Sequence, residues 1–545
     1  MVRRLAKHAS RFQKYNRIIQ EQLNSGFIEK IPIGEQNQRK GHYVPHHGVF
    51  KKSSTTPLRI VYNCSRKSKG GVSLNDCLET GPSLQNNIVE ILLRFRAHEI
   101  AMTADIEKAY RQIQLHEDDR DFVRFLWIKD DKDPESDMEV YRFKVIPFGA
   151  NSSPFILLSV IKNHLSCETS EVAKDMDFNI NVDNLLTGCD TTEESLSYYK
   201  EANSIFQKAG LTLKSSCSND QRLNTCSASD GVNDESPQNK ILGLQWSRAR
   251  VVIALPGLKI SSFSLTGIKK RNVLRGISTV YNPLGFISLL TIPAKILIQE
   301  VWKLKLQWDD PLPIDLQDRW IGIVQGIEKS KIELSRQYLE SKLECEMLHV
   351  FVDASQYAYG AVAYLANDST GTFVLSKSRV APLRGDNKML TLPQLELMAA
   401  IIGIRIAKTI LQSFAPLRYR PKCIMWSDSQ IVLYWLAQTK TNKSQFVVNR
   451  VKTVCDFNKE HEGSWRYCPT HQNPADLLTR GITFQQFSSS SWFSGPPWLA
   501  DSKSWPEWNL TQASTSLIHL ASVHQNHPPR ISHHEKVETF HQCSM

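Results

Sequence analysis

Hydrophobic residues recur along the chain at two spacings, one typical of helices and one typical of strands. Tyr15, Ile18, Ile19 and Leu23 recur at helical spacing and predict an amphipathic helix near the start of the chain. Residues 42–66 are rich in Val, Ile and Tyr on either side of a Ser-Ser-Thr-Thr-Pro turn, which predicts two strands. The chain therefore mixes helices and strands, as α/β and α+β proteins do.

Short apolar runs that stop at an acidic residue are the most informative part of this pattern. Two predicted strands end at Asp105 and Asp353, and a third stops just before Asp428. A tight hairpin is predicted around Asp183, which apolar residues flank on both sides. A long apolar helix is predicted to begin at Leu392, with Glu396 in its first two turns. Several carboxylates are therefore expected at the ends of strands and helices.

Two stretches between these runs differ from them. Residues 217–240 are rich in Ser, Asn and Asp and show no periodicity, so we expect a surface loop there. Residues 246–345 contain a series of amphipathic helices after the basic triplet Lys269-Lys270-Arg271. These helices are suited to bridging two domains along a duplex, or they form a plain spacer.

Length and charge indicate several domains and a polyanionic partner. The 545 residues exceed one ordinary core, and the formal net charge is +11. Residues 1–70 hold 15 Lys or Arg and 3 Glu, a balance of +12, so the remaining residues sum to −1. This basic end is typical of a surface that binds nucleic acid. A solvated basic face without a partner is the alternative.

Cysteine usage and hydropathy limit the cellular compartments in which we expect this protein. The 11 cysteines include no C-x-x-C pair, which argues against a zinc ribbon and a secreted disulfide framework, so we expect reduced thiols. No segment suggests a membrane span or a signal peptide. We expect an intracellular, cytoplasmic protein without a membrane partner. Access to the nucleus and oligomeric state stay open.

Three motifs resemble the A, B and C motifs of a reverse transcriptase palm. They are Ala-Asp-Ile-Glu-Lys-Ala-Tyr at 104–110, Ile-Pro-Phe-Gly-Ala-Asn-Ser-Ser-Pro at 146–154 and Asn-Val-Asp-Asn-Leu-Leu-Thr-Gly at 181–188. The resemblance implies that Asp105 and Asp183 hold two Mg²⁺ ions for in-line attack on a phosphate. Asn184 stands where these enzymes usually have a second aspartate, and Asn181 stands where an aromatic residue is common. Loss of that charge is expected to weaken metal binding.

The same resemblance suggests a nucleotide site. Arg59 would hold the incoming triphosphate, although Asn63 replaces the usual aspartate of its strand. Tyr110 would pack under the sugar, and Phe148 would stack on the sugar or base. Lys214 would protonate the leaving pyrophosphate. An exposed strand arginine, a core tyrosine and a packing phenylalanine are the alternatives for the first three.

Further segments resemble Pao/BEL-type retrotransposon polyproteins over about residues 10–485. They are 45–47, 73–76, 269–274, 281–285 and 308–310, with Lys295 and Gln299–Trp302. The resemblance implies that the amphipathic helices form a connection region between two catalytic domains. The chain looks like an excised polymerase and ribonuclease H portion of such an element.

Four acids downstream resemble a ribonuclease H active site. Asp353, Glu396, Asp428 and Asp476 follow in that order on a predicted strand, helix, strand and loop, and none of the set is substituted. The resemblance implies that two Mg²⁺ ions bind there. His471 stands where related enzymes carry a mobile histidine that aids proton transfer or product release, or it is an ordinary loop histidine.

We therefore predict a right-hand polymerase of fingers and palm over residues 1–245, a connection region over 246–345 and a ribonuclease H-like α/β domain over 346–485. Residues 486–545 are expected to be a tail, disordered or the truncated start of an integrase region, and a working zinc site in it is not expected.

The expected function is RNA-directed DNA synthesis with hydrolysis of the RNA of the hybrid. The expected partners are an RNA template, a DNA primer, an RNA–DNA hybrid and deoxynucleoside triphosphates. Two alternatives are a polymerase-inactive nucleic-acid-binding remnant and a ribonuclease H nuclease alone. Asn63, Asn181 and Asn184 favour these alternatives, and the intact four acids argue against an inactive protein.

Overall fold

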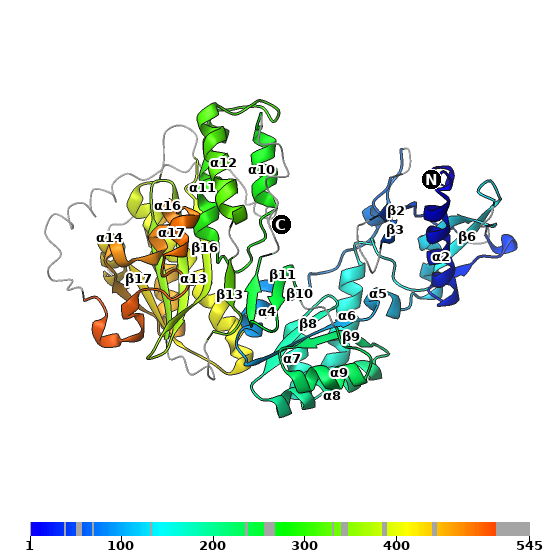
Figure 1. Ribbon diagram of the computed structural model, residues 1–545, viewed down its shortest axis with the longest axis horizontal. Helices are drawn as coiled ribbons and strands as arrows, with labels where there is room; N and C mark the ends of the chain where they lie inside the picture. Colours follow the sequence, from blue (N-terminus) through cyan, green and yellow to red (C-terminus); the bar gives the residue numbers. More distant parts are fainter. Residues whose placement is uncertain are drawn as a thin grey trace. The chain divides into compact units, whose positions relative to one another are not determined.

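The chain forms two compact units (Figure 1). The first comprises residues 1–87 and 100–235, and the second comprises residues 88–99 and 236–545. The computed structural model describes residues 2–36, 40–50, 57–67, 70–130, 133–234, 238–255, 267–329, 332–338, 347–383, 390–438 and 444–507.

The beginning of the first unit packs helices against two small sheets. Helix α2 (Ala9–Asn24) buries Phe12, Tyr15 and Ile19 on one face, as its helical spacing predicts. The ring of Tyr15 stacks on that of Trp127 with centroids 4.9 Å apart. One sheet has the order β1-β6-β5 and the other pairs β2 with β3. The remaining bounds are α1 (Val2–Ala6), β1 (Ile28–Lys30), β2 (His46–Phe50), β3 (Leu58–Tyr62), α3 (Leu74–Cys77), β5 (Arg124–Ile128) and β6 (Met138–Phe143).

The rest of the first unit is a four-stranded antiparallel sheet of order β7-β8-β4-β9, backed by helices. Helix α8 begins with a capping box between Thr191 and Glu194, which satisfies free amides of its first turn. The elements are β4 (Ile100–Ile106), α5 (Ala109–Gln112), α6 (Ser153–Cys167), α7 (Glu171–Asn179), β7 (Ile180–Asn181), β8 (Asn184–Cys189), α8 (Thr192–Lys208) and β9 (Leu213–Ser218).

The expected surface loop at 217–240 is wrong for much of its length. Helix α9 (Gln221–Ser229) occupies it, and the Asp220 side chain caps this helix by accepting from the amide of Leu223. Leu223 is buried, and α9 packs on α8 and β9. A single apolar anchor in a Ser-rich helix is too weak a periodic signal to be read from sequence.

The second unit opens with a small sheet and three helices. The sheet has the order β10-β11-β12-β13, and α11 packs against both α10 and α12. The expectation of amphipathic helices after Lys269 agrees with α10, whose Val273 is buried and whose Arg271 and Arg275 are exposed. The bounds are α4 (Ile88–Phe95), β10 (Gln238–Ile241), β11 (Leu244–Ser247), β12 (Val252–Ala254), α10 (Lys270–Ser278), α11 (Ser288–Lys303), α12 (Ile314–Lys329) and β13 (Glu333–Ser335).

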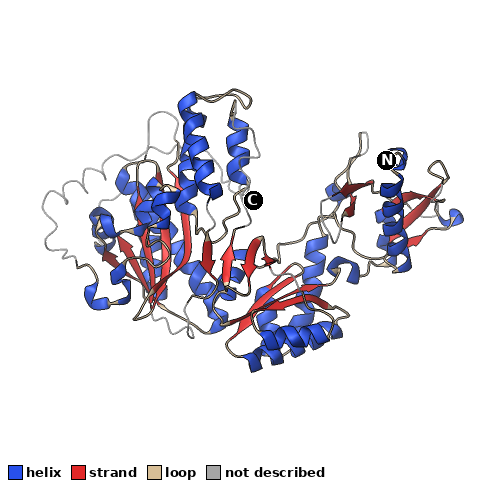
Figure 2. Ribbon diagram, in the orientation of Figure 1, coloured by secondary structure: helices blue, strands red, loops and turns tan. Residues whose placement is uncertain are grey.

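A mixed five-stranded sheet of order β16-β15-β14-β17-β18 forms the core of the second unit (Figure 2). Strand β14 pairs antiparallel with β15 and parallel with β17. Helix α13 packs so closely on β14 that a Cβ at Gly403 would lie 2.6 Å from a methyl of Val352. The elements are β14 (Met347–Ala354), β15 (Ala358–Ala366), β16 (Gly371–Val380), α13 (Leu392–Phe414), β17 (Lys422–Ser427), α14 (Gln430–Ala437), α15 (Gln445–His461), β18 (Ser464–Tyr467), α16 (Leu477–Arg480) and α17 (Phe484–Ser488).

The C-terminal segment 491–507 packs against this sheet, whereas the sequence suggested a separate tail from residue 486. Trp492 is buried and donates its indole N–H to the Phe286 carbonyl at 2.9 Å. The ring centroid of Trp498 lies 4.8 Å from that of Trp426, and that of Trp505 lies 5.5 Å from it. Residues 508–545, with the expected histidine-rich run, lie outside the described residues.

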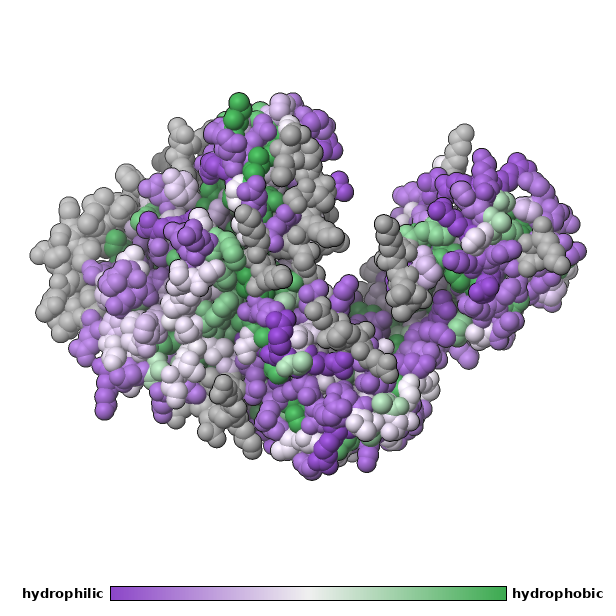
Figure 3. Space-filling view, viewed as in Figure 1, coloured by the Kyte–Doolittle hydropathy of each residue, from purple (hydrophilic) through white to green (hydrophobic). Residues whose placement is uncertain are grey.

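The visible surface is mostly hydrophilic, with small and separate hydrophobic areas (Figure 3). Among the described residues, one helical stretch, Leu392–Leu417, has the length and hydropathy of a membrane span, and 67% of its apolar window is buried inside the molecule. It contributes Leu397, Ile404 and Ile410 to the core, which explains its apolar composition. The described cysteines are all free thiols.

Candidate active sites

The first site lies where β4 ends beside the β7–β8 hairpin. Asp105 is opposite Asn184 in the β4–β8 register and opposite Lys214 in the β4–β9 register. The hairpin turns at Val182, whose φ is +57°, and the Asp183 carbonyl accepts from the Ile106 amide at 2.7 Å. The sheet therefore brings together three residues that the sequence places in separate motifs.

At this site the proton affinity of Asp105 is raised. Asp105 is solvent-exposed at the sheet edge, yet partial desolvation and the charges of Asp183 and Asp234 raise its pKa to about 6. Asp234 was not anticipated from sequence. Its amide donates to the Ser216 carbonyl at 2.8 Å, which holds it along the edge of β9.

The two asparagines of the hairpin have defined partners. The Asn184 amide donates to Asp183 Oδ1 at 2.7 Å, so it occupies one carboxylate oxygen of its neighbour. Asn181 donates to the Asn86 carbonyl at 3.2 Å, and Asn86 in turn donates to the Ile180 carbonyl at 2.9 Å. Asn181 therefore stabilises the hairpin, and Asn184 is the substitution that alters the carboxylate site.

The nucleotide-site residues are brought together in part. Tyr110 and Phe148 meet edge to face with ring centroids 4.7 Å apart, and Phe148 is half exposed. Lys214 forms an ion pair with Glu107 at 2.8 Å. Arg59 is exposed on β3, opposite Val49. Among the described residues, no ion pair or ring contact joins Arg59 to Tyr110, Phe148 or Lys214.

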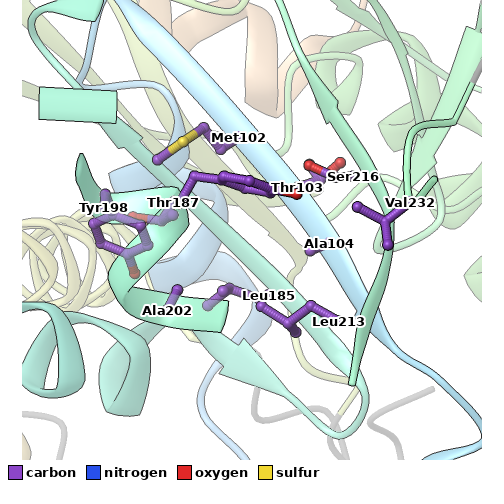
Figure 4. Close-up of a pocket in the computed structure, with 11 residues that line it drawn as sticks. Met102, Thr103, Ala104, Leu185, Thr187, Tyr198, Ala202, Leu213, Ser216 and Val232 are labelled. Carbon is purple, nitrogen blue, oxygen red and sulfur yellow. The ribbon is translucent and has the colours of Figure 1, made fainter. Parts of the chain in front are cut away.

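Behind the same sheet lies a narrow apolar pocket between the strands and α8 (Figure 4). Met102, Ala104, Leu185 and Ala202 are on its walls. Since side chains alternate along a strand, Asp105 projects to the other side from Ala104. The pocket is therefore a gap in the core and is separate from the carboxylate site.

The second site lies at the ends of β14 and β17. These strands run parallel, with Val352 opposite Ser427, so Asp353 and Asp428 follow at the same edge of the sheet. Asp353 is buried, and burial together with the Asp428 charge raises its pKa to about 7. Burial also raises the pKa of Glu396 to about 7, with a contribution from Asp428.

Hydrogen bonds fix three of these carboxylates. The Thr479 hydroxyl donates to Asp353 at 2.7 Å, and the Ser429 hydroxyl donates to Glu396 at 2.5 Å. Asp476 forms an ion pair with Arg480 Nε at 2.6 Å.

The Asn473 amide secures the loop that carries Asp476. It donates to the Val352 carbonyl at 3.0 Å and lies 3.5 Å from Asp428 Oδ1. Thr479, Ser429 and Asn473 were not predicted from sequence, where the only available signal was that each lies one to three residues from a predicted acid.

Buried carboxylates with raised pKa values fit a divalent cation, because uncompensated negative charge is what such an ion neutralises. Among the described residues, no three His, Cys, Asp or Glu side chains are grouped closely enough to hold a metal as they stand. At the second site, Asp476 would exchange its Arg480 ion pair for the metal.

Two family models match the chain. The model for reverse transcriptase (RNA-dependent DNA polymerase) matches residues 9–244, and that for the Pao retrotransposon-like RNaseH-like domain matches residues 269–429. The chain joins a reverse transcriptase to a Pao-type RNase H-like domain. Asp105 and Asp183 lie in the first match, and Asp353, Glu396 and Asp428 lie in the second. Asp476 lies beyond it.

Solved structures of foamy viral protease-reverse transcriptase share the fold. The dRH form in complex with double-stranded DNA is 14% identical with a TM-score of 0.55, covering 84% of this chain and 69% of that one. A complex with an RNA/DNA hybrid is 13% identical with a TM-score of 0.52, covering 84% and 53%. Another with double-stranded DNA is 14% identical with a TM-score of 0.54, covering 84% and 82%. No curated protein matches the chain.

These findings confirm the predicted family, the polymerase plus RNase H-like fold and the class of enzyme. The roles of individual residues stay predictions. His471 is exposed on the short helix η5 (Thr470–Gln472), and the adjacent Gln472 accepts from the indole of Trp498 at 2.9 Å. The C-terminal segment of this reverse transcriptase and RNase H-like chain therefore contacts the loop that carries His471.

Proposed function

We propose that this chain copies RNA into DNA with a weakened polymerase site and removes the RNA of the resulting hybrid with a complete nuclease site. An RNA template, a DNA primer and deoxynucleoside triphosphates would be the polymerase substrates. Foamy viral neighbours in complex with double-stranded DNA and with an RNA/DNA hybrid support duplexes of both kinds as partners.

In the polymerase site, Asp105 and Asp183 would hold Mg²⁺ with oxygen ligands, the type this ion prefers. When bound, Mg²⁺ supplies a Lewis acid that activates the attacking hydroxyl and neutralises phosphate charge. Lys214 would donate the proton to the leaving pyrophosphate after release from Glu107, and Arg59 would bind the triphosphate. Tyr110 and Phe148 would form the floor under the sugar.

In the nuclease site, Asp353, Glu396, Asp428 and Asp476 would hold the two Mg²⁺ ions. Thr479 and Ser429 orient two of these carboxylates, which reduces the rearrangement required on binding. His471, on its exposed loop, would act in proton transfer or product release. Divalent metals are general to both families, and magnesium is our specific proposal.

One observation carries the proposal for the polymerase. Asp105 lies in one sheet between Asn184 and Lys214, with Asp183 hydrogen-bonded to the strand that carries it. The site therefore retains two acids and the lysine, and it has lost one charge. The Asn184 amide also donates to an Asp183 oxygen that a metal would need.

Primer extension by the Asn184→Asp variant tests this proposal. We expect extension in Mg²⁺ to rise on the order of tenfold, the rate change that about 1.4 kcal/mol of transition-state stabilisation gives. Asn181→Asp is the matched control, because it adds the same negative charge to the same hairpin. Asn181 differs from Asn184 in that its side chain donates to the Asn86 carbonyl and not to a carboxylate of the site. A folded, template-binding Asn184→Asp protein without any gain would contradict the proposal.

The second candidate function is a nuclease without polymerase activity, which Asn184 favours. It predicts hybrid cleavage by the wild-type chain together with no primer extension in any divalent metal, before or after Asn184→Asp.

A further inference from the structure

Helix α4 belongs to the nuclease-bearing second unit, although elements of the first unit precede and follow it in sequence. Its blue ribbon lies among the green and yellow elements of that unit (Figure 1). It packs on α13 and buries Ile91, Leu92, Leu93 and Phe95. The reverse transcriptase match at 9–244 includes these residues, so sequence similarity and packing assign them differently.

Two fully buried arginines join this segment to the rest of the second unit. Arg96 Nε donates to the Arg336 carbonyl at 3.1 Å, and its Nη2 donates to the Phe373 carbonyl of β16 at 3.0 Å. The Arg96 guanidinium also lies 4.2 Å from the ring centroid of Tyr338. We call Arg96, Arg336 and Tyr338 the arginine clamp.

The other two clamp residues bind the end of α4. Arg336 Nη1 donates to the carbonyls of Phe95 at 3.0 Å and His98 at 2.6 Å, and its Nη2 donates to that of Glu99 at 2.6 Å. The Tyr338 hydroxyl donates to the Leu93 carbonyl at 3.1 Å. Carbonyls at a helix C-terminus lack partners within the helix and carry partial negative charge, so they suit these donors.

All of these acceptors are backbone carbonyls. A buried guanidinium is costly unless its donors are satisfied, and burial lowers the pKa of both arginines. If residues 88–99 left their place, Arg336 would lose the acceptors at Phe95, His98 and Glu99 together. Within the described part of the chain, Arg336 Nε has no hydrogen-bond partner. The hydrogen bonds that Nη1 and Nη2 donate are therefore the ones that compensate for the burial of this guanidinium.

We infer that the second unit contains a docking site for residues 88–99 and that this site holds the two parts of the chain together after the backbone between them is cut. The occupant is this chain's own segment, recognised by its main-chain carbonyls and by the apolar face of α4. The inference does not depend on the proposed catalytic activities.

A cut at the boundary of the units tests it. A protease site inserted between Glu235 and Ser236 would yield pieces 1–235 and 236–545, and only the first contains the docked segment. We expect the cut pieces to elute together in a 1:1 ratio on size exclusion. Separation of the wild-type pieces under native conditions would overturn the inference.

Clamp variants distinguish this site from any other attachment. Arg96→Met with Arg336→Met removes the donors and keeps much of the volume, and we expect the cut pieces to dissociate at least tenfold faster. Arg222→Met with Arg250→Met is the matched control, because both are exposed arginines in surface ion pairs. Equal dissociation of clamp variant, control and wild type would overturn the inference.

If the clamp variant does not fold, hydrogen exchange on the uncut wild-type chain still tests the inference. Amides of 91–95 should exchange as slowly as those of the α13 core. Exchange at the rate of exposed loops would show that the segment is not docked.

Discussion

Asp353 combines burial with a charge that the proposed nuclease reaction would require. Its pKa of about 7 means that near neutral pH the carboxyl holds a proton for part of the time without a metal. Proton and metal would therefore compete for it. This residue destabilises the folded chain whenever it is ionised and uncompensated.

We predict that Asp353→Asn stabilises the metal-free protein while it abolishes hybrid cleavage. Between pH 4 and 7 the folded carboxyl keeps a proton that the unfolded chain has lost, so rising pH lowers the free energy of unfolding of the wild type. The amide does not titrate. The gain should be small at pH 4 and reach at most about 4 kcal/mol above pH 7.

Thermal unfolding of both proteins at pH 4 and pH 8 in chelator measures this gain. The Tm difference should be larger at pH 8. A constant difference would mean that packing or hydrogen bonding, and not the charge of Asp353, determines the effect.

Thr479 should position Asp353 without touching substrate. Thr479→Val keeps the shape and removes the hydroxyl that donates at 2.7 Å, and this hydrogen bond is worth about 1–2 kcal/mol. We expect roughly tenfold weaker Mn²⁺ binding at the nuclease site and an acid limb of the pH–rate profile shifted to higher pH, because this bond lowers the Asp353 pKa. Thr479→Ser should restore both properties. If valine leaves Mn²⁺ affinity unchanged, Thr479 has no positioning role.

At the scale of elements, local sequence patterns predicted the strands but did not predict which other elements pack against them. Strands β4, β14 and β17 were predictable because each is an apolar run that stops at an acid. The docked position of α4 was not predictable, because the pattern of an amphipathic helix shows which of its faces is buried but not which element covers that face. The arginine clamp shares this limit, since Arg96 and Arg336 are 240 residues apart.

The C-terminal segment shows a similar limit. Its tryptophans have neither helical nor strand spacing, so they gave no periodic signal. Their burial depends on the face of β14 that presents His349 and Phe351 on the side away from α13.

Trp498→Ala should therefore weaken the nuclease domain. The ring contacts those of Phe351 and Trp426, and its N–H holds Gln472 beside His471. We expect a loss of about 2–3 kcal/mol in the free energy of unfolding, below the range for a fully buried tryptophan because Trp498 keeps some exposure. Trp498→Phe should recover stability but not the hydrogen bond. Denaturant unfolding measures the effect on stability, and hybrid cleavage measures the effect of losing the hydrogen bond. An alanine variant with unchanged stability would contradict the packing.

At the scale of the whole molecule, charge is concentrated in residues 1–70. We predict that neutralising five basic residues there reduces the salt dependence of duplex binding, by up to about 0.9 in slope for each phosphate that the protein no longer neutralises. Arg66 and Lys67 are exposed, and the other three lie outside the described residues. The substitutions are to Gln at Lys51, Lys52, Arg66, Lys67 and Lys69.

The control carries five Gln substitutions elsewhere in the first unit, at Lys129, Lys174, Lys200, Lys208 and Arg222. Fluorescence anisotropy over a range of salt concentrations gives both slopes. Equal slopes for the two variants would mean that the basic N-terminal region does not contact the phosphates.

The docked segment also has a consequence for synthesis of the chain. Arg96, which directly follows α4, is synthesised 240 residues before Arg336. At about 5–20 residues per second, this interval lasts on the order of 12–48 s. During that time α13, on which α4 packs, has not been made, while the elements of the first unit are already being completed. The segment that later joins the two parts therefore stays open to aggregation and chaperone binding for this part of translation.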